Sequence, residues 1–317
     1  MENKELSGKA GKTIDVIIPV YRPGAEFQKL LKRLMKQTVP VNKIIVMQTM
    51  EEGEALLHSE HERIEVFPVK KEEFDHGATR DAGAGKSDAD YILFMTQDAI
   101  PCDDKLIEKL LAGSLKEKVG ICYARQLPRK EADLVEQMTR EFNYPAQSRL
   151  KTSADRETLG IKTYFSSDVC AMYDRALYQK LGGFVHPTIF NEDMIMAYRV
   201  IEAGYAVYYQ AEAKVFHSHS YTCMQQFHRN FDLGVSQKQY SEIFEKISSE
   251  KEGAGYAKKI LFTLLKKGHF LMAVYFAAQC GFRLFGYKLG KHYDKLPYQI
   301  LMKCTASKGY ILFHKDF

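Results

Sequence analysis

A carboxylate follows one of the most apolar segments of the chain. The run Tyr91–Met95 is typical of a buried strand, and Thr96-Gln97-Asp98 comes directly after it, before the turn at Pro101. In open α/β sheets, ligands bind just beyond the carboxyl ends of the strands. Asp98 is therefore a candidate to hold a divalent cation against a diphosphate. The alternative is a structural role, in which Asp98 closes a turn or caps a helix that begins near Asp103.

Two further polar pairs stand at the ends of predicted elements. Glu192 and Asp193 open a helix expected over 192–203, where a carboxylate can act as a general base or simply complement the helix N-terminus. His217 and His219 follow a strand expected at 213–216. Their i, i+2 spacing puts both imidazoles on one face, as metal ligands require, although single histidines are more often surface or core residues.

The stretch 76–86 is rich in glycine and alanine and predicts a short helix packed close to the sheet. Gly77 is conformationally permissive, and Arg80 is either an ordinary surface cation or a guanidinium fork for a diphosphate. Gly85-Lys86-Ser87 does not complete a phosphate-binding P-loop. That motif needs a glycine where this chain has Arg80, and the residues after Ser87 lead into a strand instead of a helix.

Alternating short apolar runs and helical patterns position these residues and predict an α/β fold. Strands are expected at 14–20, 43–47, 63–67, 91–95, 119–124, 165–173, 205–209 and 213–216. Helices are expected around 27–34, 76–86, 132–142, 175–181 and 192–203, with an irregular loop over 144–162. From about Cys223 the chain changes to basic, aromatic helices.

The overall composition is that of a folded protein of 317 residues, 45% hydrophobic and 27% charged. This mix excludes a disordered chain, and a net charge of +5 is too small for a DNA-coating protein. The charge is divided, because residues 226–317 hold 15 Lys and Arg against 7 Asp and Glu. Six scattered cysteines without a C-x-x-C pair fit reduced thiols in the cytosol. Neither a secretory signal nor a membrane-spanning segment is expected, since the longest apolar stretch is only Phe270–Phe282.

The order of the motifs resembles that of the family 2 glycosyltransferases. The resemblance rests on I-I-P-V-Y at 17–21, H-G-A-T-R at 76–80, T-Q-D-A-I-P at 96–101, and G-G-F followed by N-E-D at 191–193. It covers roughly residues 14–235 and implies the GT-A nucleotide-diphospho-sugar transferase fold, a mixed, mostly parallel sheet between helices. We expect a catalytic domain over 1–225 and a basic helical region over 226–317.

Finer signatures are similar to those of bacterial rhamnosyltransferases, namely R-Q-L-P at 125–128, F-N-Y-P at 142–145 and F-H-S-H at 216–219. They imply dTDP-β-L-rhamnose as the donor and a saccharide hydroxyl as the acceptor, in cell-surface polysaccharide synthesis. The donor-binding residues implied by the family are Pro19, Val20, Tyr21, Arg22, Gln48, Gly77, Arg80, Gln97 and Asp98. Gln48 stands where the family usually has an acid that reads the pyrimidine.

The resemblance also implies a divalent cation, Mg²⁺ or Mn²⁺. The D-x-D motif of the family is reduced here to Thr96-Gln97-Asp98, so that Asp98 is the main acidic ligand and His217 or His219 completes the metal shell. Asp193 matches the catalytic base of the family's acid-acid motif, beside Glu192. Direct displacement inverts the anomeric centre and would give an α-rhamnoside.

The basic C-terminal region fits a lipid-linked acceptor at the inner face of the cell membrane. We expect a cytoplasmic protein that binds an anionic membrane surface peripherally through 258–291, with Phe262, Phe270, Tyr275 and Phe285 as anchors. The alternative is that these side chains pack on the catalytic domain or form a homodimer interface. No recognisable nucleic-acid-binding module is present, and nucleic acid is not expected as a partner.

Three other functions remain open from the sequence. A related transferase could use another nucleotide sugar, such as a UDP-hexose. A sugar- or membrane-binding scaffold with a decayed catalytic centre would explain the missing first Asp of D-x-D. A nucleotidyltransferase would need a glycine-rich loop after the first strand, whereas Tyr21-Arg22-Pro23-Gly24 stands there.

Overall fold

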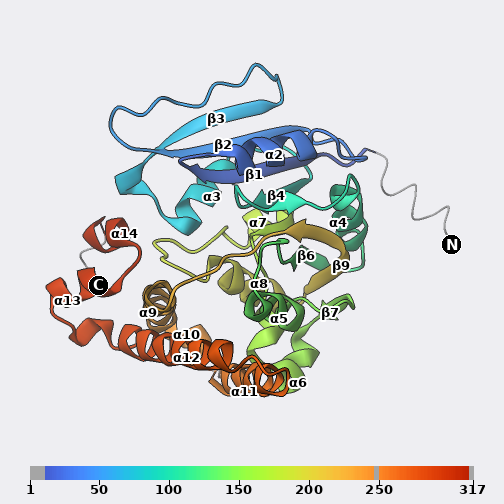
Figure 1. The fold of residues 1–317 in the computed structure, drawn as a ribbon. Coiled ribbons are helices and arrows are strands. Elements are labelled where there is room, and N and C mark those ends of the chain that lie inside the picture. The colour runs from blue at the N-terminus through green and yellow to red at the C-terminus, as the bar shows by residue number, and fades with distance from the viewer. Residues whose placement is uncertain (1–10, 246–249, 314–317) are drawn as a thin grey trace.

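The computed structural model describes residues 11–245 and 250–313, and one mixed sheet runs through it (Figure 1). Within these residues the strand order is β3-β2-β1-β4-β8-β6-β9-β5, with β7 paired to β9. The strands are β1 (Ile14–Tyr21), β2 (Lys43–Met50), β3 (Ile64–Lys70), β4 (Tyr91–Met95), β5 (Ile100–Pro101), β6 (Val119–Leu127), β7 (Arg149–Lys151), β8 (Cys170–Asp174) and β9 (Ala206–Phe216). The expected mixed sheet is confirmed, and its longest ladders are parallel.

Helices cover both faces of this sheet, because its inner strands are apolar on both sides. Ile14, Val16 and Ile18 of β1 pack with α2 and α4, whereas Ile17 packs on the face covered by α3, α7 and α8. The helices that precede β9 in the chain are α2 (Ala25–Leu34), α3 (His76–Ala84), α4 (Leu106–Ser114), α5 (Leu134–Asn143), α6 (Arg156–Leu159), α7 (Arg175–Lys180) and α8 (Glu192–Glu202). Single 3₁₀ turns are η1 (Lys71–Glu73), η2 (Ser153–Asp155) and η3 (Gly160–Tyr164).

One edge of the sheet gathers strand ends from distant parts of the chain. β1 and β4 are parallel, β8 is antiparallel to both β4 and β6, and β9 is parallel to β6. The strands β1, β4, β6 and β9 therefore run in the same direction and finish at the same edge, where β8 begins. This topology brings together the residues that follow Tyr21, Met95 and Phe216, as the rule for open α/β sheets predicts.

The strand expected at 165–173 is shorter than predicted and begins only at Cys170. Ser167 and Asp168 do not continue the ladder, because their backbone groups are used elsewhere. The carbonyl of Ser167 accepts from the N–H of Cys170 in a turn, and the N–H of Asp168 donates to the carboxylate of Asp193.

Two other predictions need correction. The region 144–162 is not irregular, because it contains β7, η2, α6 and η3. Lys151 of β7 is buried, and its ammonium donates to the phenol oxygen of Tyr123 at 3.2 Å, a contact that three residues of sequence pattern cannot reveal. The strands expected at 205–209 and 213–216 form the single strand β9, whose register against β6 shifts midway.

The C-terminal helices lie together on one side of the sheet, with α9 and α12 packed against each other (Figure 1). They are α9 (Cys223–Gln239), α10 (Ser241–Phe244), α11 (Glu250–Lys266), α12 (Phe270–Gly290), α13 (Tyr298–Cys304) and α14 (Lys308–Phe313), with η4 (Tyr293–Lys295). The boundary expected at residue 225 lies in the first turn of α9. Among the described residues, no helix is both long and apolar enough to cross a membrane.

Glycines allow α9 and α12 to meet backbone to backbone. A Cβ atom at Gly286 would overlap the carbonyl oxygen of Phe227, and one at Gly290 would overlap that of Phe231. On its other side, α9 is tied to the loop before α8, because Asn191 donates its side-chain amide to Ser236 Oγ at 3.0 Å. The C-terminal helices are therefore joined firmly to the α/β body.

Replacing Gly290 by alanine should lower the free energy of unfolding by about 1–3 kcal/mol, because the methyl group would push α12 away from the Phe231 carbonyl. Urea unfolding followed by circular dichroism measures this change. Gly281 on the same helix is the matched control. Nothing lies within 4 Å of a Cβ there, so Gly281→Ala should keep or slightly raise the stability. Equal unfolding free energies for the two variants would contradict the close packing.

Candidate active site

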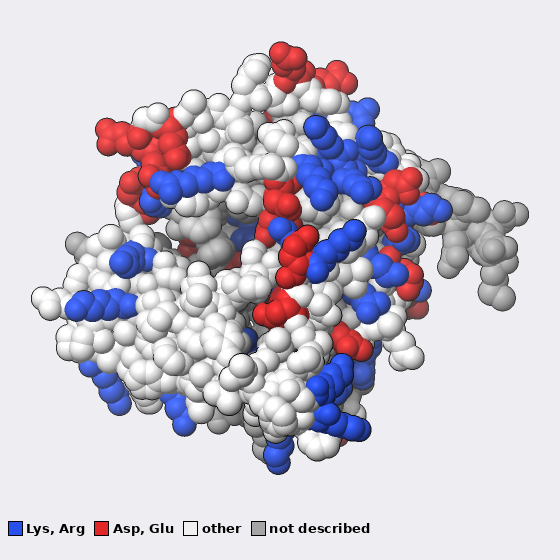
Figure 2. Space-filling model, in the orientation of Figure 1, with Lys and Arg blue, Asp and Glu red and all other residues white. Residues whose placement is uncertain are grey.

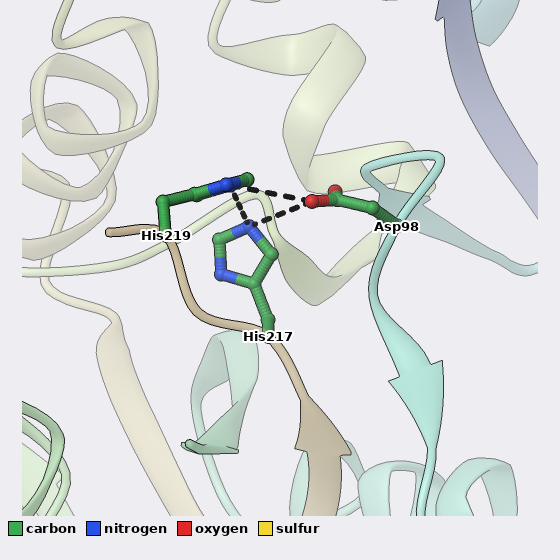
Figure 3. Close-up of side chains that lie close together, drawn as sticks. All are labelled: Asp98, His217 and His219. Carbon is green, nitrogen blue, oxygen red and sulfur yellow. Dashed lines mark hydrogen bonds and ion pairs between the residues drawn. The ribbon is translucent and has the colours of Figure 1, made fainter. Parts of the chain in front are cut away.

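Asp98, His217 and His219 converge at the edge where the strands end (Figure 3). Asp98 follows β4, and both histidines follow β9. Oδ2 of Asp98 lies 3.6 Å from Nε2 of His217 and 3.2 Å from Nε2 of His219, and the two Nε2 atoms are 3.0 Å apart. All three ligand atoms lie within 4.8 Å of one another, so that one divalent ion could contact all of them. The structure thus brings together the three residues expected to form a metal site.

Gln126 on β6 orients the ring of His217. The amide nitrogen of Gln126 donates to Ser167 Oγ, so its carbonyl oxygen is left to accept from Nδ1 of His217 at 2.9 Å. The lone pair of His217 is then on Nε2, the atom nearest Asp98. Burial lowers the pKa of His217 to about 3, and the ring is neutral at physiological pH. A neutral imidazole oriented through its other nitrogen is the form that binds metals.

The donor set can be compared with the two expected cations. Two imidazole nitrogens and one carboxylate suit a first-row transition ion, whereas Mg²⁺ prefers an octahedral shell of oxygens and water. Mn²⁺ therefore fits the set of Asp98, His217 and His219 better than Mg²⁺. Arg129, which the sequence reasoning missed, donates to the Asp98 carbonyl at 2.9 Å and adds positive charge beside the cluster.

A buried guanidinium organises a second group of charges next to the first. Arg80 on α3 is only 6% exposed, which excludes the surface role that the sequence left open. Its Nη1 lies 3.1 Å from Oε1 of Glu192, and its Nε lies 3.7 Å from Oδ2 of Asp168. Nη1 also donates to the backbone carbonyl of His76 at 3.0 Å, which fixes the side chain along α3.

Asp193 lies in the first turn of α8, half-buried beside Glu192. Its Oδ1 accepts from the backbone amide of Met194 at 2.7 Å, and its Oδ2 accepts from that of Asp168 at 3.4 Å. Burial raises the pKa of Asp193 to about 7, and the charge of Glu192 adds to the rise. A partly exposed carboxylate with a pKa near neutrality is suited to accept a proton from a hydroxyl group.

Asp168 completes this group, and the sequence reasoning missed it. Its carboxylate is 2% exposed and accepts from the phenol of Tyr173 at 2.7 Å. Burial and the nearby charge of Asp193 raise the pKa of Asp168 well above its usual range. The polar triplet Ser166-Ser167-Asp168 at the start of an apolar run is the signal that could have revealed it.

Gln97 ties the end of β1 to the metal-ligand cluster. Its side-chain amide accepts from the N–H of Tyr21 at 2.9 Å and donates to the carbonyl of the same residue at 3.0 Å. Pro19 and Val20 precede Tyr21 in β1, and Val20 is buried in the core. Arg22 follows with a left-handed backbone (φ 46°), and its exposed guanidinium pairs with a neighbouring glutamate.

Two of the expected donor-binding residues lie in packing contacts. Gln48 is buried, and its amide donates to the carbonyl of Ala55 at 3.1 Å and accepts from the N–H of Leu57 at 2.7 Å. Both ends of the side-chain amide are thus used by the loop after β2, while the backbone of Gln48 pairs with Val20 in the β1–β2 ladder. Gly77 lies against the carbonyl of Val185, where a Cβ atom would overlap, and lets α3 approach the loop before α8.

Residues 15–182 match the family model described as Glycosyl transferase family 2. The chain belongs to this family. Along its length the glycosyltransferase is similar to O-antigen chain rhamnosyltransferase RfbN of Salmonella typhimurium strain LT2, with 37% identity over 304 residues that cover 94% of this chain and 95% of that protein. It is also similar to O-antigen chain rhamnosyltransferase WbaN of Salmonella anatum, with 34% identity over 302 residues and 93% and 94% coverage.

A solved structure supports the fold. Mannosyltransferase PcManGT from Pyrobaculum calidifontis, in complex with GDP-Man and Mn²⁺, matches with a TM-score of 0.56 and 13% identity, over 86% of this chain and 87% of that one. At this identity the likeness shows the fold alone. The resemblance to family 2 glycosyltransferases and the GT-A-like fold that it implied are therefore confirmed, and the protein is an enzyme of this class.

Gln126→Ala should weaken Mn²⁺ binding about 10- to 100-fold, because His217 would lose the partner that orients its ring. Titration with MnCl₂, followed by the electron paramagnetic resonance signal of the free ion, measures the affinity. Gln137→Ala is the control. Among the described residues, the side-chain amide of Gln137 donates only to the backbone carbonyl of Ala132, just before α5. Unchanged Mn²⁺ binding by His217→Ala would rule out the cluster as the metal site.

Proposed function

We propose that this glycosyltransferase moves L-rhamnose from dTDP-β-L-rhamnose to a hydroxyl of a saccharide, with inversion, in the synthesis of a cell-surface polysaccharide. The observation that carries the proposal is the combination of Asp193, with its pKa near neutrality, and the cluster of Asp98, His217 and His219 at one sheet edge. The choice of sugar is supported by the two relatives, each an O-antigen chain rhamnosyltransferase.

Asp193 is the proposed general base. Its carboxylate takes the proton of the acceptor hydroxyl as that oxygen bonds to the anomeric carbon and the bond from this carbon to the diphosphate breaks. The backbone amides of Met194 and Asp168 hold the carboxylate in place. Glu192 supports the base, because its charge helps to keep the pKa of Asp193 near neutrality and its carboxylate holds Arg80.

Asp98, His217 and His219 are the proposed ligands of Mn²⁺ or Mg²⁺. When bound, this ion supplies positive charge to the leaving diphosphate. Arg129 adds fixed positive charge beside Asp98, whereas the charge of Arg80 is paired with Glu192 and Asp168. The missing first carboxylate of D-x-D is offset by two neutral imidazoles, which argues against a decayed scaffold.

Incubation with dTDP-β-L-rhamnose, Mn²⁺ and a saccharide acceptor should release dTDP, and Asp193→Asn should lower kcat by about 10²- to 10⁴-fold while donor affinity stays within about twofold. In the unsubstituted enzyme kcat/KM should rise with pH and level off above about 7, because only the deprotonated carboxylate is active. The variant should lack this inflection. Coupled nucleotide-release assays and calorimetry with dTDP provide the measurements.

Glu202→Gln, at the other end of α8, is the matched control and should keep both kcat and the pH profile. Faster turnover with a UDP-hexose than with dTDP-rhamnose would replace the proposed donor by the alternative one. Absence of metal-dependent nucleotide release with every dTDP-, UDP- and GDP-sugar would favour the scaffold.

We further propose that the acceptor is lipid-linked and is reached at the inner face of the cell membrane. α12 is mostly apolar, yet only a few of its residues, such as Ala273 and Phe276, are buried. The exposed apolar face of α11 and α12 comprises Phe262, Leu265, Phe270, Leu271, Val274, Tyr275, Phe282, Leu284 and Phe285, which are 38–89% exposed. It includes all four anchors expected from the sequence, so these side chains do not pack on the catalytic domain.

The charges around this face match an anionic lipid surface. Residues 253–293 contain seven Lys and Arg and no Asp or Glu. Figure 2 shows a broad surface of uncharged residues over the C-terminal helices, with basic residues at its margin. Each basic residue near an anionic membrane contributes about 1 kcal/mol, and inserted aromatic side chains add to this.

Combined replacement of Phe262, Phe270 and Leu271 by serine should reduce binding to vesicles of anionic lipid at least tenfold in flotation assays. Leu56→Ser with Leu150→Ser is the control, because these apolar side chains are also exposed, at 41% and 44%, but lie outside the C-terminal helices. If the triple variant still floats, the membrane proposal is wrong. If it does not float but also changes from dimer to monomer in light scattering, the face is a homodimer interface.

A further inference from the structure

The C-terminal segment of the described chain forms one wall of a cavity at the edge where the strands end. We call residues Ala306–Tyr310 the C-terminal wall. Its cavity has a volume of about 380 Å³, within the range of about 300–1,000 Å³ that small-molecule sites occupy. Its other walls include Tyr21 and Thr49 from the ends of β1 and β2, and Phe74 and His76 at the start of α3.

The cavity borders both charged groups of the active site. The backbone N–H and carbonyl of Tyr21 are both hydrogen-bonded to the side chain of Gln97, which precedes the metal-ligand candidate Asp98. His76 lies 4.0 Å from the Glu192 carboxylate through its Nδ1 atom. A molecule in the cavity would therefore be within reach of the strand-end edge where the chemistry is proposed.

Thr49 supplies an unsatisfied polar group to this cavity. The residue is 4% exposed, and its hydroxyl oxygen has no hydrogen-bond partner among the described residues. A buried hydroxyl without a partner is unfavourable, and such groups are usually satisfied by a ligand or a water molecule. Its position in the wall of the cavity indicates that the partner is a molecule bound there.

The C-terminal wall is a fixed part of the fold. Asp232 on α9, itself 2% exposed, accepts from the hydroxyl of Thr305 at 2.6 Å and from the backbone amide of Ala306 at 3.1 Å. Tyr310 and Ile311 are buried in the cluster formed by α9 and the loop before α8. These contacts hold the segment at both ends, so that its exposed residues face the cavity in a defined position.

Lys308 is the cation of this wall. It is exposed, lines the cavity and has no ion-pair partner among the described residues. Lys71, the other lysine at the cavity, is by contrast paired with Glu51. The unpaired ammonium group of Lys308 is therefore free to attract an anionic ligand.

We propose that the C-terminal wall is part of the donor site and that a pyrimidine nucleoside diphosphate occupies this cavity. The Thr49 hydroxyl bonds to the nucleoside, Phe74 offers an apolar ring beside it, and Lys308 attracts the diphosphate. This inference rests on the proposed function, because it assumes a nucleotide-sugar donor. It adds a binding element from the far end of the chain, outside the part that matches the family model.

The test uses the full-length enzyme with Mn²⁺ and three probes, dTDP, UDP and GDP, in calorimetric titrations. Lys308→Ala should raise the Kd for dTDP about tenfold, and Thr49→Val, which removes only the hydroxyl, should raise it about 5- to 20-fold. Lys303→Ala on α13 is the matched control, since Lys303 is exposed but does not line the cavity. In turnover assays both cavity variants should raise the KM of the donor and leave that of the acceptor unchanged.

The outcomes separate the two proposals. If dTDP binds the unsubstituted enzyme and both cavity variants equally well, the inference is wrong while the proposed function stands. If UDP binds more tightly than dTDP and depends on Lys308, the inference is retained and the proposed donor is wrong. If GDP binds most tightly, the pyrimidine nucleotide inferred for the cavity and the proposed donor are both wrong. A rise in the acceptor KM alone would make the cavity an acceptor site and overturn the inference. If no nucleoside diphosphate binds, both proposals fail.

Discussion

A single buried cation holds the catalytic edge of this fold together. The guanidinium of Arg80 lies between Glu192 and Asp168, with Asp193 beside them, so that three carboxylates share one positive charge. Burying unpaired charge costs several kcal/mol, and α3, α8 and the start of β8 can pack together only because Arg80 offsets part of it. Burial is the main cause that raises the pKa of Asp168 far above its usual range and that of Asp193 to about 7, and the remaining repulsion between the carboxylates adds to both shifts. This setting suits the role of general base at neutral pH that is proposed for Asp193.

A neutral side chain connects this group to the metal-ligand candidates. Gln126 donates to Ser167, the neighbour of Asp168, and accepts from His217 on the other side. The oxygen of the same amide also accepts from the guanidinium of Arg140, whose charge helps to keep the two imidazoles neutral. Residues on both sides of the site are thus held through the same strand, β6.

The residues that sequence alone predicted well are those whose place follows from topology. Asp98, His217 and His219 come after apolar strands, and parallel strands end at a common edge, so their meeting was predictable. Asp168 and Gln126 were missed because their roles depend on side-chain contacts across the sheet, which leave no periodic pattern. Gln48 stays a predicted nucleotide contact, but the bonds of its amide to the loop after β2 were not foreseen, because they depend on how that loop folds back. The glycines of α12 were not informative in the sequence, since close contact with α9 appears only when the helices are packed.

The close contact between α9 and α12 fixes the distance between the exposed apolar face and the active site. α9 is bonded on one side to Asn191, which precedes Glu192 and the proposed base Asp193. On its other side α9 meets α12 without intervening side chains at Gly286 and Gly290. The separation and tilt between the exposed apolar face and the catalytic carboxylate are thus fixed dimensions of the fold. If this face inserted into a lipid surface, the active site would be held at one height above the headgroups. Such an enzyme would select its acceptors by how far the reacting hydroxyl stands from its lipid as well as by chemical identity.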